Sequence, residues 1–74
     1  MFNLEIGQEL EFIEPATTDE RVIPKGTRVR VGAFTAELTE PKVMIVILGG
    51  KSAETLTVAK RILMMHCRLL PKSR

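Results

Sequence analysis

The stretch VMIVILGGKSAETLTV, residues 43–58, decides the fold that we expect for this chain of 74 residues. It begins with Val43–Leu48, a continuous run of β-branched and other apolar side chains, which is typical of a central strand covered on both sides. We therefore expect Val46 or Ile47 to be buried. A Gly-rich connection follows, and the segment 55–58 then alternates threonine with apolar residues. This order predicts an antiparallel hairpin between the two segments.

The N-terminal segment LEIGQELEF, residues 4–12, alternates apolar with acidic or polar side chains. A period of two is the pattern of a half-buried strand, so we predict a first strand near residues 8–14. Pro15 ends this strand because proline cannot donate to a sheet ladder. The next residues, ATTDERVIPKG, are mostly polar and lack helical periodicity, which predicts a long loop.

The segment TRVRVGAF, residues 27–34, resumes the alternation, with the valines predicted to face inward and the arginines outward. Gly32 then shifts the phase of the pattern to Phe34 and Ala36. A bulge or a sharp bend at this glycine explains the shift. The residues LTEPK supply a turn between this strand and the run at 43–48.

The segment AKRILMMHCRLLP, residues 59–71, fits two structures, because its apolar residues recur both at helical spacing and in strand alternation. We predict a short helical turn over Ala59–Leu63 and a last strand over Met65–Leu70. A single helix over 59–70 stays as the alternative. Pro71 ends the strand, and residues 71–74 are expected to fray.

This order of elements, with a long loop after the first strand and a helical turn before the last, resembles the small five-stranded SH3-like barrel. The resemblance covers roughly Gly7 to Pro71 of one domain, residues 1–74. Within it, IPKGTRVRV (Ile23–Val31) looks like the start of the second strand in bacterial barrels that serve as accessory subunits or assembly factors. The resemblance implies an all-β fold and a role as a partner protein, not as an enzyme.

The amino-acid composition argues against several classes of function. The chain is 45% apolar and 27% charged, which is ordinary for a globular domain, and it has no Tyr or Trp. The aromatic groove with which signalling members of the superfamily bind proline-rich peptides is therefore not expected. One cysteine cannot form an intrachain disulfide, and the longest apolar run is far shorter than the roughly 20 residues that span a bilayer. We predict a cytoplasmic protein that needs no cofactor and no membrane.

The charges divide along the chain. Residues 1–20 hold six acidic side chains and no Lys or Arg, whereas residues 21–74 hold eleven basic side chains and three acidic ones. Such a division predicts either one acidic and one basic face, or a first strand that neutralises basic strands beside it in the sheet. We favour neutralisation, since neighbouring strands of a small sheet bring the two signs together.

Three local patterns resemble reactive sites, and each has a simpler explanation. His66 and Cys67 point to opposite faces if they are neighbours in a strand, so they cannot share a metal or act as base and nucleophile. Glu9 and Glu11 lie on one strand face with no cleft for carboxylate catalysis. The GGKS sequence lacks the earlier glycine of a phosphate-binding loop and is better explained as a hairpin turn. We assign no catalytic, cofactor-binding or metal-binding residue.

A possible interaction surface remains in the basic residues, which could form a stripe that binds phosphates or an acidic partner. The candidate set, which we call the basic set, consists of Lys25, Arg28, Arg30, Lys60, Arg61 and Arg68, with Lys72 in the tail. The preferred hypothesis is a module that binds a larger protein partner or associates with itself. The alternative is a nucleic-acid-binding module that uses the basic stripe.

Overall fold

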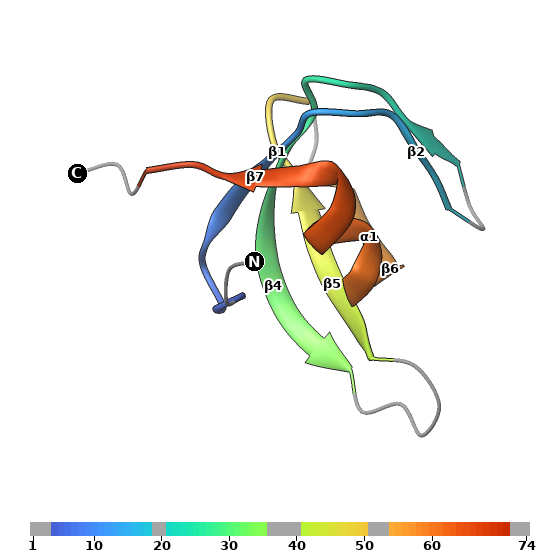
Figure 1. Cartoon of the computed structure of the whole chain (residues 1–74). Coiled ribbons are helices and arrows are strands. Elements are labelled where there is room, and N and C mark those ends of the chain that lie inside the picture. Colours follow the sequence, from blue (N-terminus) through green and yellow to red (C-terminus); the bar gives the residue numbers. More distant parts are fainter. Residues whose placement is uncertain (1–3, 19–20, 36–40, 51–53, 72–74) are drawn as a thin grey trace.

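The chain folds mainly into β-structure with one short helix, as the sequence predicts (Figure 1). The structure, a computed structural model, describes residues 4–18, 21–35, 41–50 and 54–71. The elements are β1 (Glu9–Phe12), β2 (Ala16–Thr17), β3 (Val22–Ile23), β4 (Arg28–Thr35), β5 (Lys42–Ile47), β6 (Glu54–Ala59), α1 (Lys60–His66) and β7 (Cys67–Leu69). Five strands form one sheet in the order β6-β5-β4-β1-β7, and β2 and β3 form a second, two-stranded sheet.

The predicted hairpin is present as the antiparallel pair of β5 and β6, in a register that runs from Lys42 opposite Ala59 to Ile47 opposite Glu54. β5 also pairs with β4, and β4 pairs with β1, in both cases antiparallel. The run that we expected at the centre of the fold is therefore an inner strand of the sheet.

The core lies on one face of the sheet, where alternate residues of each strand are buried. In β5 these residues are Val43 and Ile45, both fully buried, whereas Val46 and Ile47 are only partly buried. The expectation that Val46 or Ile47 would be buried is thus wrong. Val46 lies opposite Arg30, on the outer face, and Ile47 packs against the core from the end of its strand. The run is fully covered on one side, not on both.

The predicted irregularity at Gly32 is confirmed. The register of β4 against β5 shifts between Val31 and Ala33, and a side chain at Gly32 would meet the Met44 carbonyl oxygen at 3.4 Å. Phe34 then lies opposite the buried Val43, which puts it on the core side. Phe34 nevertheless remains 46% exposed, near the end of the strand. Ala36 lies outside the described residues.

The predicted long loop after β1 contains a small hairpin, β2 and β3, which the sequence analysis missed. Ala16 pairs with Ile23, and both are buried. The turn is closed on one side by Thr18, whose backbone N–H and hydroxyl both donate to the Arg21 carbonyl oxygen. Two buried apolar residues at the ends of a polar stretch are therefore enough to fold it back on the core.

The C-terminal segment is a helix followed by a strand, but its boundary differs from the prediction. The helix extends over Lys60–His66, and the last strand is reduced to Cys67–Leu69. Met65, which we expected in the strand, is a helical residue with 68% exposure. Leu63 is the fully buried residue of the helix, and it turns the apolar side of α1 toward the core.

Candidate interaction surface

The outer face of β4, β1 and β7 brings together three members of the basic set. Arg30 lies opposite Glu9, and Glu11 lies between Arg28 on β4 and Arg68 on β7. The Arg30 Nη2 atom is 3.4 Å from Glu9 Oε2, and the Arg68 Nη2 atom is 2.7 Å from Glu11 Oε1. The prediction that the acidic first strand neutralises its basic neighbours is therefore confirmed. This face is an array of alternating charge and not a uniformly basic surface.

Lys25 lies in the tight turn that leads into β4. The Gly26 N–H donates to the Phe12 carbonyl oxygen at 2.7 Å, and both the N–H and the hydroxyl of Thr27 donate to the Pro24 carbonyl oxygen. Gly26 has φ of 90°, a conformation that glycine adopts readily and other residues resist. The IPKG sequence is thus a turn, which presents Lys25 to solvent at its tip.

Lys60 and Arg61 lie at the opposite end of the sheet from Arg28. Arg28 begins β4, whereas Thr35 at the other end of β4 lies opposite Lys42, and Lys42 lies opposite Ala59, the residue before the helix. At about 3.3 Å per residue, β4 runs for roughly 23 Å along the strand between these two ends. The basic set therefore does not form one stripe. Lys72 lies outside the described residues.

A groove of about 230 Å³ runs between the β2–β3 hairpin and the end of β6. Arg61 lines it together with Lys42, a residue that the sequence analysis did not select. The register of the β5–β6 hairpin is the signal that could have found Lys42, because this register puts Lys42 beside the start of the helix. The lining residues are Thr17, Thr18, Lys42, Thr57, Val58, Ala59, Arg61 and Ile62.

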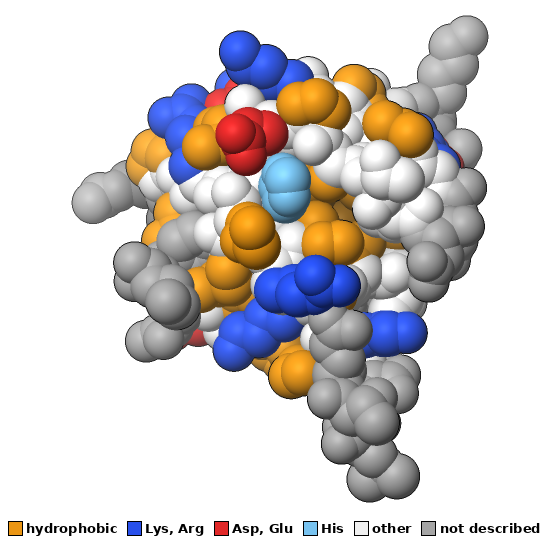
Figure 2. Space-filling model, turned by 45° about the vertical axis from the view of Figure 1, so that its right-hand side comes forward, with side chains coloured by type: hydrophobic (Ala, Val, Ile, Leu, Met, Phe, Trp, Pro, Cys, Tyr) orange, Lys and Arg blue, Asp and Glu red, His pale blue; other side chains and the backbone are white. Residues whose placement is uncertain are grey.

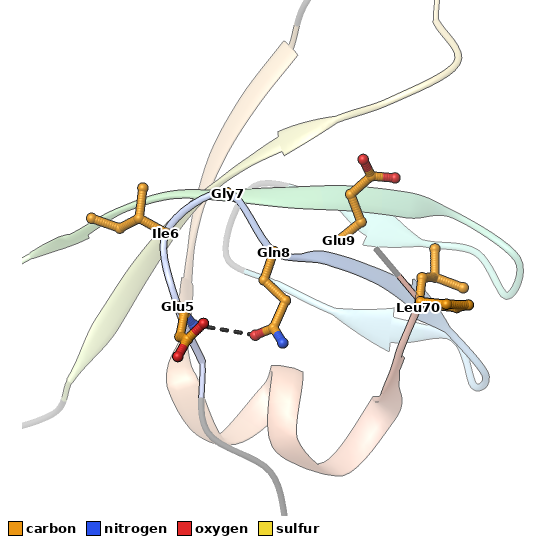
Figure 3. Close-up of a pocket in the computed structure, with 7 residues that line it drawn as sticks. Glu5, Ile6, Gly7, Gln8, Glu9 and Leu70 are labelled. Carbon is orange, nitrogen blue, oxygen red and sulfur yellow. Dashed lines mark hydrogen bonds between the residues drawn. The ribbon is translucent and has the colours of Figure 1, made fainter. Parts of the chain in front are cut away.

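Two further hollows lie near chain turns. One, of about 290 Å³, lies between the turn before β1 and the residues after β7 (Figure 3). Its wall is held by the Gln8 side chain, whose Oε1 accepts a hydrogen bond of 3.2 Å from the Glu5 N–H. The other, of about 620 Å³, lies where the turn before β4 approaches the end of β5, and the ion pair of Arg21 and Glu54 lies at its wall.

One side of α1 exposes apolar residues around the single histidine. Ile13 donates its N–H to the His66 carbonyl oxygen at 2.8 Å, so the end of β1 lies beside the end of α1. Ile13 is 46% exposed and Met65 is 68% exposed. In Figure 2 orange hydrophobic side chains lie just below the pale-blue histidine, and a red acidic side chain lies directly above it. We call the surface of Ile13, Ile62, Met65 and His66 the α1 face.

His66 and Cys67 separate at the junction of helix and strand. The His66 Nδ1 atom is 3.5 Å from Glu14 Oε1 and is itself shielded from solvent, whereas Cys67 is a free, buried thiol. Burial raises the pKa of the Cys67 thiol to about 12, which keeps it protonated and a poor nucleophile at neutral pH. Among the residues that the structure describes, no three of His, Cys, Asp and Glu gather closely enough to hold a metal ion.

The remaining sequence patterns have simple structural positions. Glu9 and Glu11 are committed to cross-strand arginines, as described above. The GGKS sequence joins β5 to β6, with Gly49 at φ of 83°, while Lys51 and Ser52 lie outside the described residues. Over the described part of the chain, no helix has the length and apolar character needed to cross a membrane.

Comparison of the chain with protein-family models, with curated proteins and with solved structures finds no significant match.

Proposed function

We propose that the chain is a non-catalytic interaction module, an accessory or adaptor protein that binds a larger protein partner through the α1 face. The observation that carries the proposal is the exposure of two large apolar residues next to His66: Met65 precedes it in α1, and Ile13 donates its N–H to the His66 carbonyl oxygen. Exposed apolar side chains that lie together, rimmed by polar groups, are typical of protein-binding surfaces. The buried, unpaired Cys67 is consistent with a protein that works in the reducing cytoplasm.

We also infer that the five-stranded sheet curves into a partly open SH3-like barrel, in which the terminal strands β6 and β7 are not paired with each other over the described residues. The strand order β6-β5-β4-β1-β7 places the last strand beside the first, and a helix comes directly before this last strand. The hairpin after β1 occupies the place of the long loop in such barrels. These features support the accessory-protein role that the sequence resemblance implies.

The charge array argues against nucleic acid as the partner. Binding to nucleic acid depends on basic side chains that neutralise phosphates. Arg30 and Arg68 are already paired with acidic side chains, and Lys60 and Arg61 lie at the other end of the sheet. The chain has no Tyr or Trp on which bases could stack.

The proposal is tested by capture of proteins from extracts of the source cells on the immobilised chain, with identification by mass spectrometry. The test variant is Met65→Glu, which places a charge on the α1 face. The matched control is Ile6→Glu, because Ile6 is exposed to nearly the same degree as Met65, 66% against 68%, but lies in the turn before β1. We expect a protein that the native chain and the control retain and that Met65→Glu loses. If every captured protein binds Met65→Glu equally well, the proposal is wrong.

A parallel titration addresses nucleic acid. Fluorescence anisotropy with mixed-sequence RNA and DNA, at low and moderate salt, is expected to show no binding. Tight binding that weakens steeply with salt and disappears in the double variant Arg28→Ala, Arg30→Ala would instead identify a nucleic-acid-binding module.

A further inference from the structure

We propose that the outer edge of β6 binds an extended, acidic segment of the partner protein as an added β-strand. The inference deepens the proposed function and rests on it, since it names a second contact by which the same partner is held. The site is the groove of about 230 Å³ described above. This groove borders the α1 face, because Ile62 belongs to that face and also lines the groove.

β6 is a terminal strand of the five-stranded sheet, so only one of its edges is paired. One hydrogen bond just past the end of the β5–β6 pair shows which residues of β6 point their backbone groups toward β5. In this bond the Lys60 N–H donates to the Pro41 carbonyl oxygen at 3.0 Å. In an antiparallel ladder, hydrogen-bonded pairs alternate with pairs that are not hydrogen-bonded. Continuing the register from this bond makes Val43 and Val58 the next hydrogen-bonded pair.

It follows that Thr55 and Thr57 direct their backbone N–H and carbonyl groups away from β5. Among the described residues, no backbone hydrogen bond outside the ladders occupies these groups. Both side chains are exposed and uncharged. Natural sheets usually protect an open edge with lysine, proline or a bulge. Between Glu54 and Lys60 this edge carries none of these three protections.

The β2–β3 hairpin forms the second wall of the site. Thr17 and Thr18 line the groove opposite Thr57, and near the other end of β6 the Arg21 side chain pairs with Glu54. An added strand lies about 4.8 Å from its neighbour. A segment bound to β6 would therefore lie in the groove between the hairpin and the edge strand. The hairpin belongs to a separate sheet and leaves the edge unpaired.

Charge selects the kind of segment. Lys42 lines the groove, and none of the described residues that line it is acidic. Lys60, at the start of α1, is exposed next to Arg61. A carboxylate on the added strand would lie close to these cations in a partly desolvated position, where attraction is stronger than in open water. The preferred occupant is thus an extended segment with acidic side chains.

The probe for the test is a fluorescein-labelled peptide of sequence TVEVEVT, compared with its lysine counterpart TVKVKVT. Affinities are measured by anisotropy, and the amides of the ¹⁵N-labelled chain are followed by NMR. We expect the acidic peptide to bind about tenfold more tightly than the basic one. At saturation, hydrogen exchange of the Thr55 and Thr57 amides should slow, because the added strand occupies these donors.

The decisive variant is Thr57→Pro, which removes an outward N–H and leaves the ladder with β5 intact. Its matched control is Thr57→Val, which keeps the N–H but lacks the hydroxyl. We expect Thr57→Pro to weaken binding about tenfold and Thr57→Val to change it less than about twofold. Lys42→Ala should weaken the acidic peptide and leave the basic one unchanged. If Thr57→Pro does not fold, the slowing of hydrogen exchange at Thr55 and Thr57 in the native chain tests the inference instead.

Several outcomes would overturn the inference. The acidic peptide could fail to bind, or both peptides could bind equally. The exchange at Thr55 and Thr57 could stay unchanged at saturation. The chain could also associate with itself, with the amides of the β6 edge already protected before the peptide is added. None of these bears on the capture experiment with Met65→Glu. The failure of this inference is therefore distinguishable from the failure of the proposed function.

Discussion

Arg30 lies directly opposite Glu9 in the antiparallel pair of β4 and β1, and their side chains approach to 3.4 Å on the outer face of the sheet. Glu11 forms the next rung of the same array, with a hydrogen bond of 2.8 Å from Arg68 Nε. This alternation of sign is the structural outcome of the division of charge along the chain. The arginines of β4 therefore lie among acidic side chains of the neighbouring strand on the outer face of the sheet.

The first prediction concerns the cost of removing those arginines. The Arg30 side chain is 51% exposed, so water and salt screen its attraction to Glu9. The double variant Arg28→Ala, Arg30→Ala removes the ion pair of Arg30 and Glu9 and should lower the free energy of unfolding by no more than about 1 kcal/mol. Urea denaturation followed by circular dichroism measures this. A loss of half the stability would mean that the charge array holds the sheet together.

The second prediction contrasts two isoleucines of β5. Ile45 is fully buried, whereas Ile47 is only partly buried at the end of the strand. Ile45→Ala should cost about 2–5 kcal/mol, a large share of the stability of so small a domain. Ile47→Ala should cost clearly less, because part of its surface already contacts water. Thermal unfolding of the two variants compares them, and equal losses would contradict the burial described here.

Much of the sheet could be predicted from the sequence, because a period of two has one simple structural meaning. The hairpin of β5 and β6, the inward valines of β4 and the bulge at Gly32 all follow from it. The depth of burial does not follow. Alternation says which side of β5 faces the core, but whether Ile47 is fully covered depends on where the strand ends in three dimensions.

The elements that were missed depend on tertiary contacts. The β2–β3 hairpin is held by Ala16 and Ile23, two apolar residues separated by a polar stretch with no periodic pattern. In the C-terminal segment helix and strand patterns overlap, and the helix extends to His66, after which the Cys67 N–H donates to the Leu63 carbonyl oxygen. The position of Lys42 in the groove was not predicted, because it depends on the register of β5 against β6.

The third prediction concerns the turn before β4. Gly26 has φ of 90°, and no atom lies within 4 Å of the position that a Cβ would take. A substitution therefore costs backbone strain without a steric clash. Gly26→Val should destabilise the fold by about 1–3 kcal/mol, and Gly26→Asn by less, since asparagine tolerates positive φ better. Urea denaturation distinguishes the two variants. If Gly26→Val left the free energy of unfolding unchanged, the described turn would be contradicted.

The last prediction concerns the buried thiol. Burial raises the pKa of Cys67 from 9.0 to about 12 because the thiolate would lose its hydration. Between these values the unfolded chain releases the thiol proton while the folded chain keeps it, so ionisation favours unfolding. The stability that Cys67 contributes should be fully present below pH 9.0 and should decrease as the pH rises toward about 12.

The measurement for Cys67 is urea denaturation of the native chain and of Cys67→Ala at about pH 8 and about pH 10.5, where the other titrating groups are common to both proteins. The difference in unfolding free energy between them should shrink by up to about 1.4 kcal/mol for each pH unit above the ordinary thiol pKa. Iodoacetamide should also alkylate the folded thiol far more slowly than the denatured one at the lower pH. A constant difference together with rapid alkylation would show that Cys67 is solvated, and the core would then have to open at the junction of α1 and β7.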